Sequence, residues 1–216
     1  MLILAFDTAT PAVTVALHDG SGVLAQESAV DARRHGELLT PSINRLLAVA
    51  GAAPRDLTSI AVGTGPGPYT SLRVGLVTAR VLGSALEIEV DGICTLDVIA
   101  TAASQSAGGR EFIVATDARR REVYSARYSP AAERLSGPEV SSPALVPTGC
   151  PVAGQGPLLY AELAAEPLAP CFPAAAQLAE ISAHRLSSGM PASPATPRYL
   201  RRPDAKVPGR PKRVTQ

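Results

Sequence analysis

The chain has 216 residues, of which 46% are hydrophobic and 18% charged, and its formal net charge is +1 at pH 7. A chain of this length and composition can bury a substantial core, which excludes a wholly disordered protein. Trp is absent and only 4% of the residues are aromatic, so we expect an aliphatic core. Recognition of nucleic acid by stacking bases on aromatic rings is poorly supported for the same reason.

The cysteines and the N-terminus indicate a cytoplasmic protein. Cys94, Cys150 and Cys171 lie far apart and form no CxxC pair, which favours reduced thiols over a disulfide framework. The first apolar run ends at Asp7, and no basic segment precedes it. No other apolar run approaches the roughly 20 residues that a membrane span needs. We therefore expect neither a targeting segment nor a membrane partner.

Charge is unevenly distributed along the chain. After position 197, one acidic residue, Asp204, accompanies seven basic residues, namely Arg198, Arg201, Arg202, Lys206, Arg210, Lys212 and Arg213. The rest of the chain holds 13 basic and 18 acidic residues. Clustered cations release counterions from phosphates, so this tail is a candidate for contact with tRNA. A solvated, disordered tail explains the same composition.

Strand patterns dominate the N-terminal segment. Residues 2–6 form an apolar run that ends at Asp7, and residues 13–17 alternate before the turn signal Asp19-Gly20. Residues 23–28 are expected to form a third strand. The segment is therefore predicted to be a β-meander.

Two helices follow on periodicity. Apolar residues recur at intervals of three and four between His35 and Gly51, and residues 59–63 predict a short buried strand. The loop GTGPGPYT then leads into a helix over residues 71–86, with Thr70 as its N-cap. We expect a further strand and short helix within residues 88–103, and a last helix over residues 174–186.

The start of the sequence is repeated in the second half. Residues 4–17 align with residues 114–127 without a gap, and the alignment matches Asp7 to Asp117 and Val13 to Val123. This predicts an internal duplication, with one half in residues 1–105, a second and reduced half in 106–200, and a basic tail in 201–216. The polar, glycine-rich run SQSAGGR marks the boundary.

Duplicated meanders that each begin with a strand ending in Asp, with helices between them, are typical of the α/β fold of actin, Hsp70 and sugar kinases, whose turns hold nucleotide phosphates. The candidate anion or nucleotide residues are Asp7, Thr8, Thr10, Gly65, Gly67, Thr70 and Asp117. The loop over residues 63–70 precedes a helix N-terminus, which favours an anion, but it lacks the Gly-Lys-Ser/Thr of a Walker A loop. Three arginines, 119–121, stand where a phosphate turn would carry glycine. For the loop over residues 63–70 a purely structural role stays open. For the arginine turn, a solvated charged turn and anion binding in a different manner both stay open.

Other catalytic motifs are not found in the sequence. It contains neither GxSxG nor HExxH, and His18, His35 and His184 are isolated. His35 is expected to be a capping or surface residue. The residues therefore predict a phosphate-site scaffold without catalytic equipment.

Several segments together resemble the bacterial TsaB family, namely FDTAT, RRHGELLTP, GTGPGPYTSLRVG, GICTLDVIA, DARRREVYSARY and PRYLRRPDA. The most specific of them, GPGPYTSLRVG, is similar to the family's GPGSFTGLRIG. The resemblance implies a non-catalytic relative of TsaD, the enzyme that transfers a threonylcarbamoyl group to the adenosine beside the tRNA anticodon. In TsaD a metal is held by an HxxxH pair, and the matching positions here are Thr95 and Ile99, so the resemblance implies no metal and no cofactor of the chain's own.

The resemblance also implies partners. These are TsaD in a heterodimer, TsaE within the same complex, and a second copy when the chain is alone. Whether ATP or another nucleotide binds at the TsaD interface is left open, and tRNA is expected to be met indirectly or through the basic tail. The implied contact faces lie on the N-terminal helices and carry His35, Leu39, Ile43, Leu46, Leu72, Arg73, Leu76 and Ala79. Amphipathic helices usually bury such faces in their own core, and this alternative stays open.

Two enzymatic alternatives are less well supported. An autonomous ATPase or small-molecule kinase would need a base near its substrate and a glycine-rich second turn, where this chain has three arginines. A metallopeptidase would need metal ligands that the sequence does not group. We therefore favour a subunit of the tRNA-modifying machinery.

Overall fold

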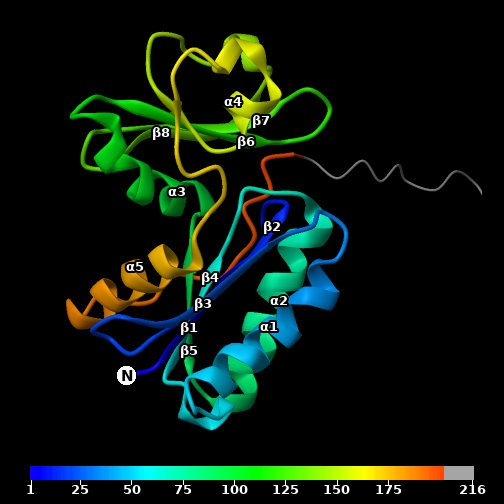
Figure 1. Ribbon diagram of the computed structural model, residues 1–216, viewed down its shortest axis with the longest axis vertical. Helices are drawn as coiled ribbons and strands as arrows, with labels where there is room; N and C mark the ends of the chain where they lie inside the picture. The colour runs from blue at the N-terminus through cyan, green and yellow to red at the C-terminus, as the bar shows by residue number, and fades with distance from the viewer. Residues whose placement is uncertain (202–216) are drawn as a thin grey trace, which may run out of the picture.

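A computed structural model describes residues 1–201 as two five-stranded sheets (Figure 1). The basic tail predicted from residue 201 onward lies, apart from Arg201 itself, outside the described residues. In spatial order, the first sheet consists of β3 (Val23–Val30), β2 (Ala12–His18), β1 (Ile3–Asp7), β4 (Ser59–Gly63) and β5 (Glu89–Ile93). The second consists of β10 (Pro167–Leu168), β9 (Val152–Ala153), β6 (Phe112–Asp117), β7 (Val123–Tyr128) and β8 (Arg134–Ser141).

Both sheets follow one plan. The first three strands of each half form an antiparallel meander, and the next two strands continue in parallel from the meander's first strand. This topology confirms the predicted two-halved, actin-like α/β fold. The gapless alignment is wrong by one position, however. Asp7 pairs with Thr14, whereas Asp117 pairs with Val123, so the second turn is one residue shorter than the first.

The helices cover the sheets in layers. The α-helices are α1 (His35–Val49), α2 (Tyr69–Leu86), α3 (Thr95–Ala103), α4 (Gly156–Leu159) and α5 (Ala175–Ser187). Short 3-10 helices are η1 (Pro54–Asp56), η2 (Ser104–Ala107), η3 (Pro143–Leu145) and η4 (Ala161–Leu163). Helices α1 and α2 lie on one face of the first sheet, and α5 lies on the other (Figure 1).

Two helices pack on the sheet of the other half. Helix α3 precedes the predicted boundary at residue 105, yet Leu96 and Ile99 pack with Phe112 of the second sheet. Helix α5 follows that boundary, yet Leu178 packs with Ile3 of the first sheet. The boundary therefore separates the sheets but not the helices, and the two halves hold each other through this exchange.

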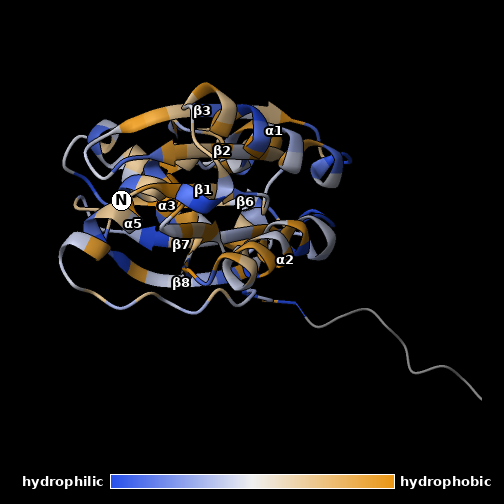
Figure 2. Cartoon of the chain, turned by 90° about the horizontal axis from the view of Figure 1, so that it is seen from below, coloured by the Kyte–Doolittle hydropathy of each residue, from blue (hydrophilic) through white to orange (hydrophobic). Residues whose placement is uncertain are grey.

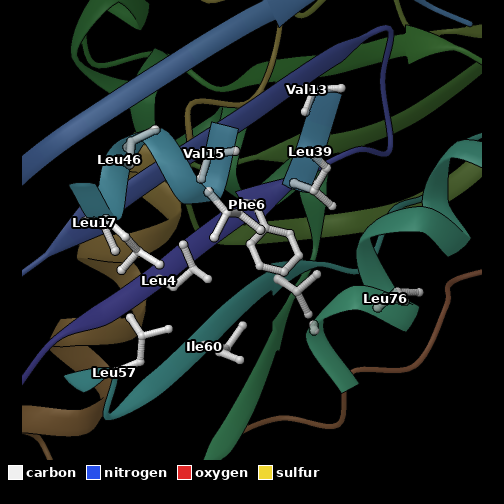
Figure 3. Close-up of a cluster of buried hydrophobic side chains, with 14 of the residues drawn as sticks. Leu4, Phe6, Val13, Val15, Leu17, Leu39, Leu46, Leu57, Ile60 and Leu76 are labelled. Carbon is white, nitrogen blue, oxygen red and sulfur yellow. The ribbon is translucent and has the colours of Figure 1, made fainter. Parts of the chain in front are cut away.

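The largest core lies between the first sheet and helices α1 and α2. Phe6 sits at its centre, with Leu39 of α1 and Ile60 of β4 nearby (Figure 3). Both helices are amphipathic, with hydrophobic and hydrophilic residues alternating around them (Figure 2). The apolar residues expected at a partner interface face this core and are each at most 5% exposed: Leu39, Ile43, Leu46, Leu72, Leu76 and Ala79. Their assignment as contact residues is therefore wrong, because the chain's own sheet covers them.

Several element ends differ from the sequence prediction. Strand β3 runs on to Val30, and α2 begins at Tyr69 with Pro68 as its N-cap, so Thr70 is not the cap. Proline has no side-chain oxygen that could accept an N–H of the first turn, so the helix starts without a side-chain cap. The three cysteines are free thiols, as expected. Among residues 1–201, no helix is both long enough and apolar enough to cross a membrane.

Candidate functional site

The turn after β1 is built around the buried carboxylate of Asp7, which is fully inaccessible to solvent. Its Oδ1 accepts the Ala9 N–H at 2.6 Å, and its Oδ2 accepts the Thr95 hydroxyl at 2.7 Å. Burial raises the pKa of Asp7, an effect that the hydrogen bond from Thr95 partly opposes. Both carboxylate oxygens are therefore occupied by the chain's own donors.

The loop over residues 63–70 is tied to the same turn. Thr95 joins it twice, because its hydroxyl accepts the Gly65 N–H at 3.1 Å and its N–H donates to the Gly65 carbonyl at 2.9 Å. A side chain at Gly67 would overlap the carbonyl oxygen of Ala9. The loop thus lies directly on the turn, where a phosphate would have to enter between them.

The Thr8 hydroxyl is likewise engaged in hydrogen bonds within the chain. Its hydroxyl donates to the Ser71 carbonyl at 2.7 Å and accepts the Gly75 N–H at 3.1 Å, so it fastens the turn to the first two turns of α2. The predicted cradle of Asp7, Thr8, Gly65 and Gly67 is brought together by the fold. It is closed by internal hydrogen bonds rather than open to a ligand.

The turn after β6 is the counterpart of this arrangement in the second half. Asp117 accepts the Arg119 N–H at 2.8 Å and the Tyr160 hydroxyl at 3.3 Å. Burial, followed by the charge of Asp117, raises the pKa of Tyr160. Residues 154–157, Gly-Gln-Gly-Pro, follow β9, and the similar residues 63–66, Gly-Thr-Gly-Pro, begin at the last residue of β4. This second repeat was missed in the sequence because β9 is only two residues long.

The arginines of the second turn adopt an unusual backbone conformation. Arg119, Arg120 and Arg121 have φ angles of 61°, 57° and 59°, in the left-handed region that favours glycine. Arg119 also contacts Asp117, with 3.4 Å between the guanidinium and the carboxylate. The turn is formed by bulky, charged residues at a steric cost.

A cavity of about 150 Å³ lies between Arg119 and the first half. Its walls include the first residues of α1 and α2, and they are formed by Thr10, Pro11, Ala32, Arg33, His35, Gly36, Pro68, Thr70, Ser71, Val74 and Arg119. Of the predicted anion residues, Thr10 and Thr70 therefore line a space, whereas Asp7, Gly65 and Gly67 are buried and do not line it. The expectation that His35 lies at the surface is wrong, because it is 5% exposed and its Nε2 bonds the Thr10 carbonyl at 2.8 Å.

The outward face of α2 carries a stripe that the sequence analysis did not single out. Tyr69, Val77 and Val81 are 48%, 56% and 60% exposed, and Arg73 lies between them at the same spacing of four residues. Residues four apart share a helix face. Of the predicted contact residues, Arg73 alone lies on this stripe. The apolar residues Tyr69, Val77 and Val81, spaced by multiples of four, form a second periodic pattern on α2 from which this stripe was predictable.

An extended C-terminal strap, residues 190–201, runs beside this stripe. Tyr199 stacks on Tyr69 with ring centroids 5.2 Å apart and accepts the Arg73 Nε–H at 2.9 Å. The strap is fixed to the first sheet because Gly92 N–H donates to the Ser193 carbonyl at 2.8 Å. At its far end, Arg201 pairs with Glu122 and donates to the Arg119 carbonyl. The strap therefore joins α2 to the turn of the second half.

Comparison with known proteins identifies the family. A family model described as "TsaD: tRNA N6-adenosine threonylcarbamoyltransferase" matches residues 22–156. YeaZ from Pseudomonas aeruginosa superposes with a TM-score of 0.76 at 28% identity, over 92% of this chain and 99% of that one. The TsaB protein of Escherichia coli, a tRNA threonylcarbamoyladenosine biosynthesis protein, is 35% identical over 128 residues. The chain belongs to the TsaB (YeaZ) family.

Relatives of this TsaB family member differ in how much of the chain they match. An uncharacterized protein of Mycobacterium tuberculosis is 44% identical over 208 residues, which span 94% of this chain and 93% of that one. The match to the E. coli TsaB protein spans 59% of this chain and 55% of the E. coli protein. A Pseudomonas aeruginosa protein with similarity to peptidase YEAZ has a TM-score of 0.80. At the positions compared with the TsaD metal ligands, Thr95 bonds Asp7 and Ile99 is buried in the core.

Proposed function

We propose that the chain is a non-catalytic subunit of the machinery that makes threonylcarbamoyladenosine in tRNA, and that it acts by binding TsaD. The observation that carries this proposal is the closed first turn in a chain of the TsaB family. The Thr95 hydroxyl donates to Asp7 and accepts the Gly65 N–H of the loop over residues 63–70. The carboxylate is also fully inaccessible to solvent, so a metal ion or a water molecule cannot reach its remaining lone pairs unless the turn opens.

The outward stripe of α2 is the surface that we assign to TsaD. Tyr69, Val77 and Val81 expose apolar area on a helix whose other face is already buried in the core. Tyr and Arg are the residue types most often found at the centre of protein interfaces, and Tyr69 and Arg73 stack face to face with 3.6 Å between the guanidinium carbon and the ring centroid. The strap adds Tyr199 to the same surface.

Paired substitutions test the surface directly. Val77→Glu and Val81→Glu place charge in the proposed contact, so co-purification with TsaD should be lost while the chain remains folded. Leu145→Glu is the matched control, because Leu145 is 76% exposed on the second half and should leave the complex intact. Equal complex formation by all three variants on size exclusion would remove α2 as the contact surface.

The function itself is tested by genetic replacement. A bacterium that depends on its own TsaB protein is depleted of that protein and supplied with this chain and its cognate TsaD. Digestion of the tRNA and mass spectrometry should then show restored threonylcarbamoyladenosine. If the nucleoside forms equally well with TsaD alone, the subunit proposal fails. Binding of ATP or another nucleotide at the TsaD contact remains a prediction.

A further inference from the structure

The three arginines of the second turn are not explained by partner binding through α2. A left-handed backbone is sterically accessible to glycine, but here Arg119, Arg120 and Arg121 all adopt it. Strained backbone at several adjacent residues is typical of functional turns. The consequence of the strain is that three consecutive guanidinium groups are presented by one turn.

The cavity beside this turn has features that suit a phosphate group. Arg119 and Arg33 belong to its walls from opposite halves of the molecule. Gly36 of α1 and Thr70 and Ser71 of α2 contribute the first turns of two helices, whose N–H groups have no partner within the helix. Its volume of about 150 Å³ corresponds to roughly five water molecules at about 30 Å³ each.

Charge accumulates at this place although the body of the chain is acidic. Arg201 reaches the turn from the strap and contacts the Arg119 carbonyl. Three carboxylates also lie here: Asp31, whose Oδ1 accepts the Arg33 N–H, Asp117, which pairs with Arg119, and Glu122, which pairs with Arg201. Arg120 and Arg121 add two exposed basic residues to the turn itself.

We propose that Arg33, the arginine turn over residues 119–121 and the cavity between them bind backbone phosphates of RNA. The proposal rests on the proposed function, because it gives the subunit a direct contact with the RNA being modified. A free nucleotide fits less well, since ordinary ligand pockets span about 300–1,000 Å³. An RNA backbone needs only one phosphate in the cavity, while the neighbouring arginines meet adjacent phosphates along the surface.

The test measures binding of a fluorescent tRNA transcript to the full chain by anisotropy at 50 and 200 mM salt. The triple variant Arg119→Ser, Arg120→Ser and Arg121→Ser should bind at least about tenfold more weakly, with a shallower salt dependence. The corresponding triple lysine variant should retain most of the affinity, because backbone recognition needs charge. Arg55→Ser, Arg110→Ser and Arg127→Ser together remove the same charge elsewhere and form the control.

Each result decides between sources of the phosphate. Equal weakening by the control triple would overturn the site in favour of net charge alone. Saturable ATP binding without tRNA binding would overturn backbone recognition. A wild-type chain that restores the modified nucleoside, together with a serine triple variant that binds tRNA unchanged, would refute this site and leave the proposed function standing.

Discussion

The turns that follow Asp7 and Asp117 connect equivalent strands in the two halves but differ in burial and charge. Asp7 is fully buried, and its turn is pinned by Thr95 and covered by the loop over residues 63–70. The side chain of Asp117 is 13% exposed, and its turn projects three arginines. The first turn has become part of the core, and the second has become a charged surface.

This difference shows that two turns of the same topology can have different structural roles. The backbone topology is kept in both halves, because the strand pairing that holds each turn also holds the sheet. What differs is which groups satisfy the aspartate and which side chains follow it. Four substitutions test this contrast, and they are taken from the largest expected effect on stability to the smallest.

Gly67→Ala tests the closure of the first turn. The new methyl group would overlap the Ala9 carbonyl oxygen and stand 2.9 Å from the carbonyl carbon, so the loop must move away from the turn. We expect a loss of about 3 kcal/mol in the free energy of unfolding, measured with urea. Gly36→Ala is the control, because nothing lies within 4 Å of a Cβ there and alanine favours the helix. Equal, small effects at both positions would show that the turn is not closed.

Asp7→Asn tests the hydrogen bonds of the buried carboxylate. Replacing an acceptor oxygen by an NH₂ group disturbs the bond from Thr95 or from Ala9, at a cost of about 1–2 kcal/mol. Asp117→Asn should cost less at the same pH, because that side chain is partly solvated.

The cost of Asp7→Asn also depends on pH in a defined direction. Because burial raises the pKa of Asp7 above 3.8, the folded state holds more protons than the unfolded state between that value and the folded pKa. Wild-type stability from this group therefore falls as the pH rises through that window, and the asparagine variant lacks the trend. Its deficit relative to wild type should shrink between pH 4.5 and 7.5 in urea titrations. A deficit that grows with pH would contradict the burial of Asp7.

Arg121→Gly tests the strain in the second turn. Glycine adopts a φ of 59° without steric cost, so the variant should gain about 0.5–1 kcal/mol in stability while its affinity for tRNA falls. Arg127→Gly is the comparison, since Arg127 is the second-last residue of β7 and glycine there should destabilise the strand by a similar amount. Thermal unfolding of the two variants should move in opposite directions.

The sequence predicted the repeated strands better than the contacts between them. The runs ending at Asp7 and Asp117 identified both meanders, because an apolar run that ends in Asp and is followed by a turn and a return strand leaves a strong local pattern. The exchange of α3 and α5 between the sheets left no such pattern, since an amphipathic helix does not specify which sheet it covers. For the same reason, Leu39 and Leu76 were predicted at a partner interface, although they pack in the chain's own core. Periodicity identifies the apolar face of a helix but not what covers that face.

The candidate site was predicted in its members but not in its geometry. Asp7, Thr8 and Gly67 were expected to hold an anion, and they meet in space as predicted. That they close on each other depends on Thr95, which is 88 positions away in the sequence and was considered only as a former metal position. The left-handed backbone of Arg119–Arg121 could not be read either, because arginine rarely adopts it.

Glu122→Gln is the smallest change and bears on the second turn alone. Glu122 pairs with Arg201 at a partly exposed position, and surface pairs of this kind contribute at most about 1 kcal/mol, so unfolding should change little. Affinity for tRNA should rise about twofold at 50 mM salt and approach the wild-type value at 200 mM, because removing a carboxylate beside bound phosphates relieves a screened repulsion. Glu111→Gln is the matched control, since Glu111 pairs with Arg127 away from the turn and should leave tRNA binding unchanged. A fall in affinity with Glu122→Gln would mean that the carboxylate holds Arg201 in place for the RNA, and the second turn would then depend on an ion pair where the first depends on the hydrogen bond from the Thr95 hydroxyl to Asp7.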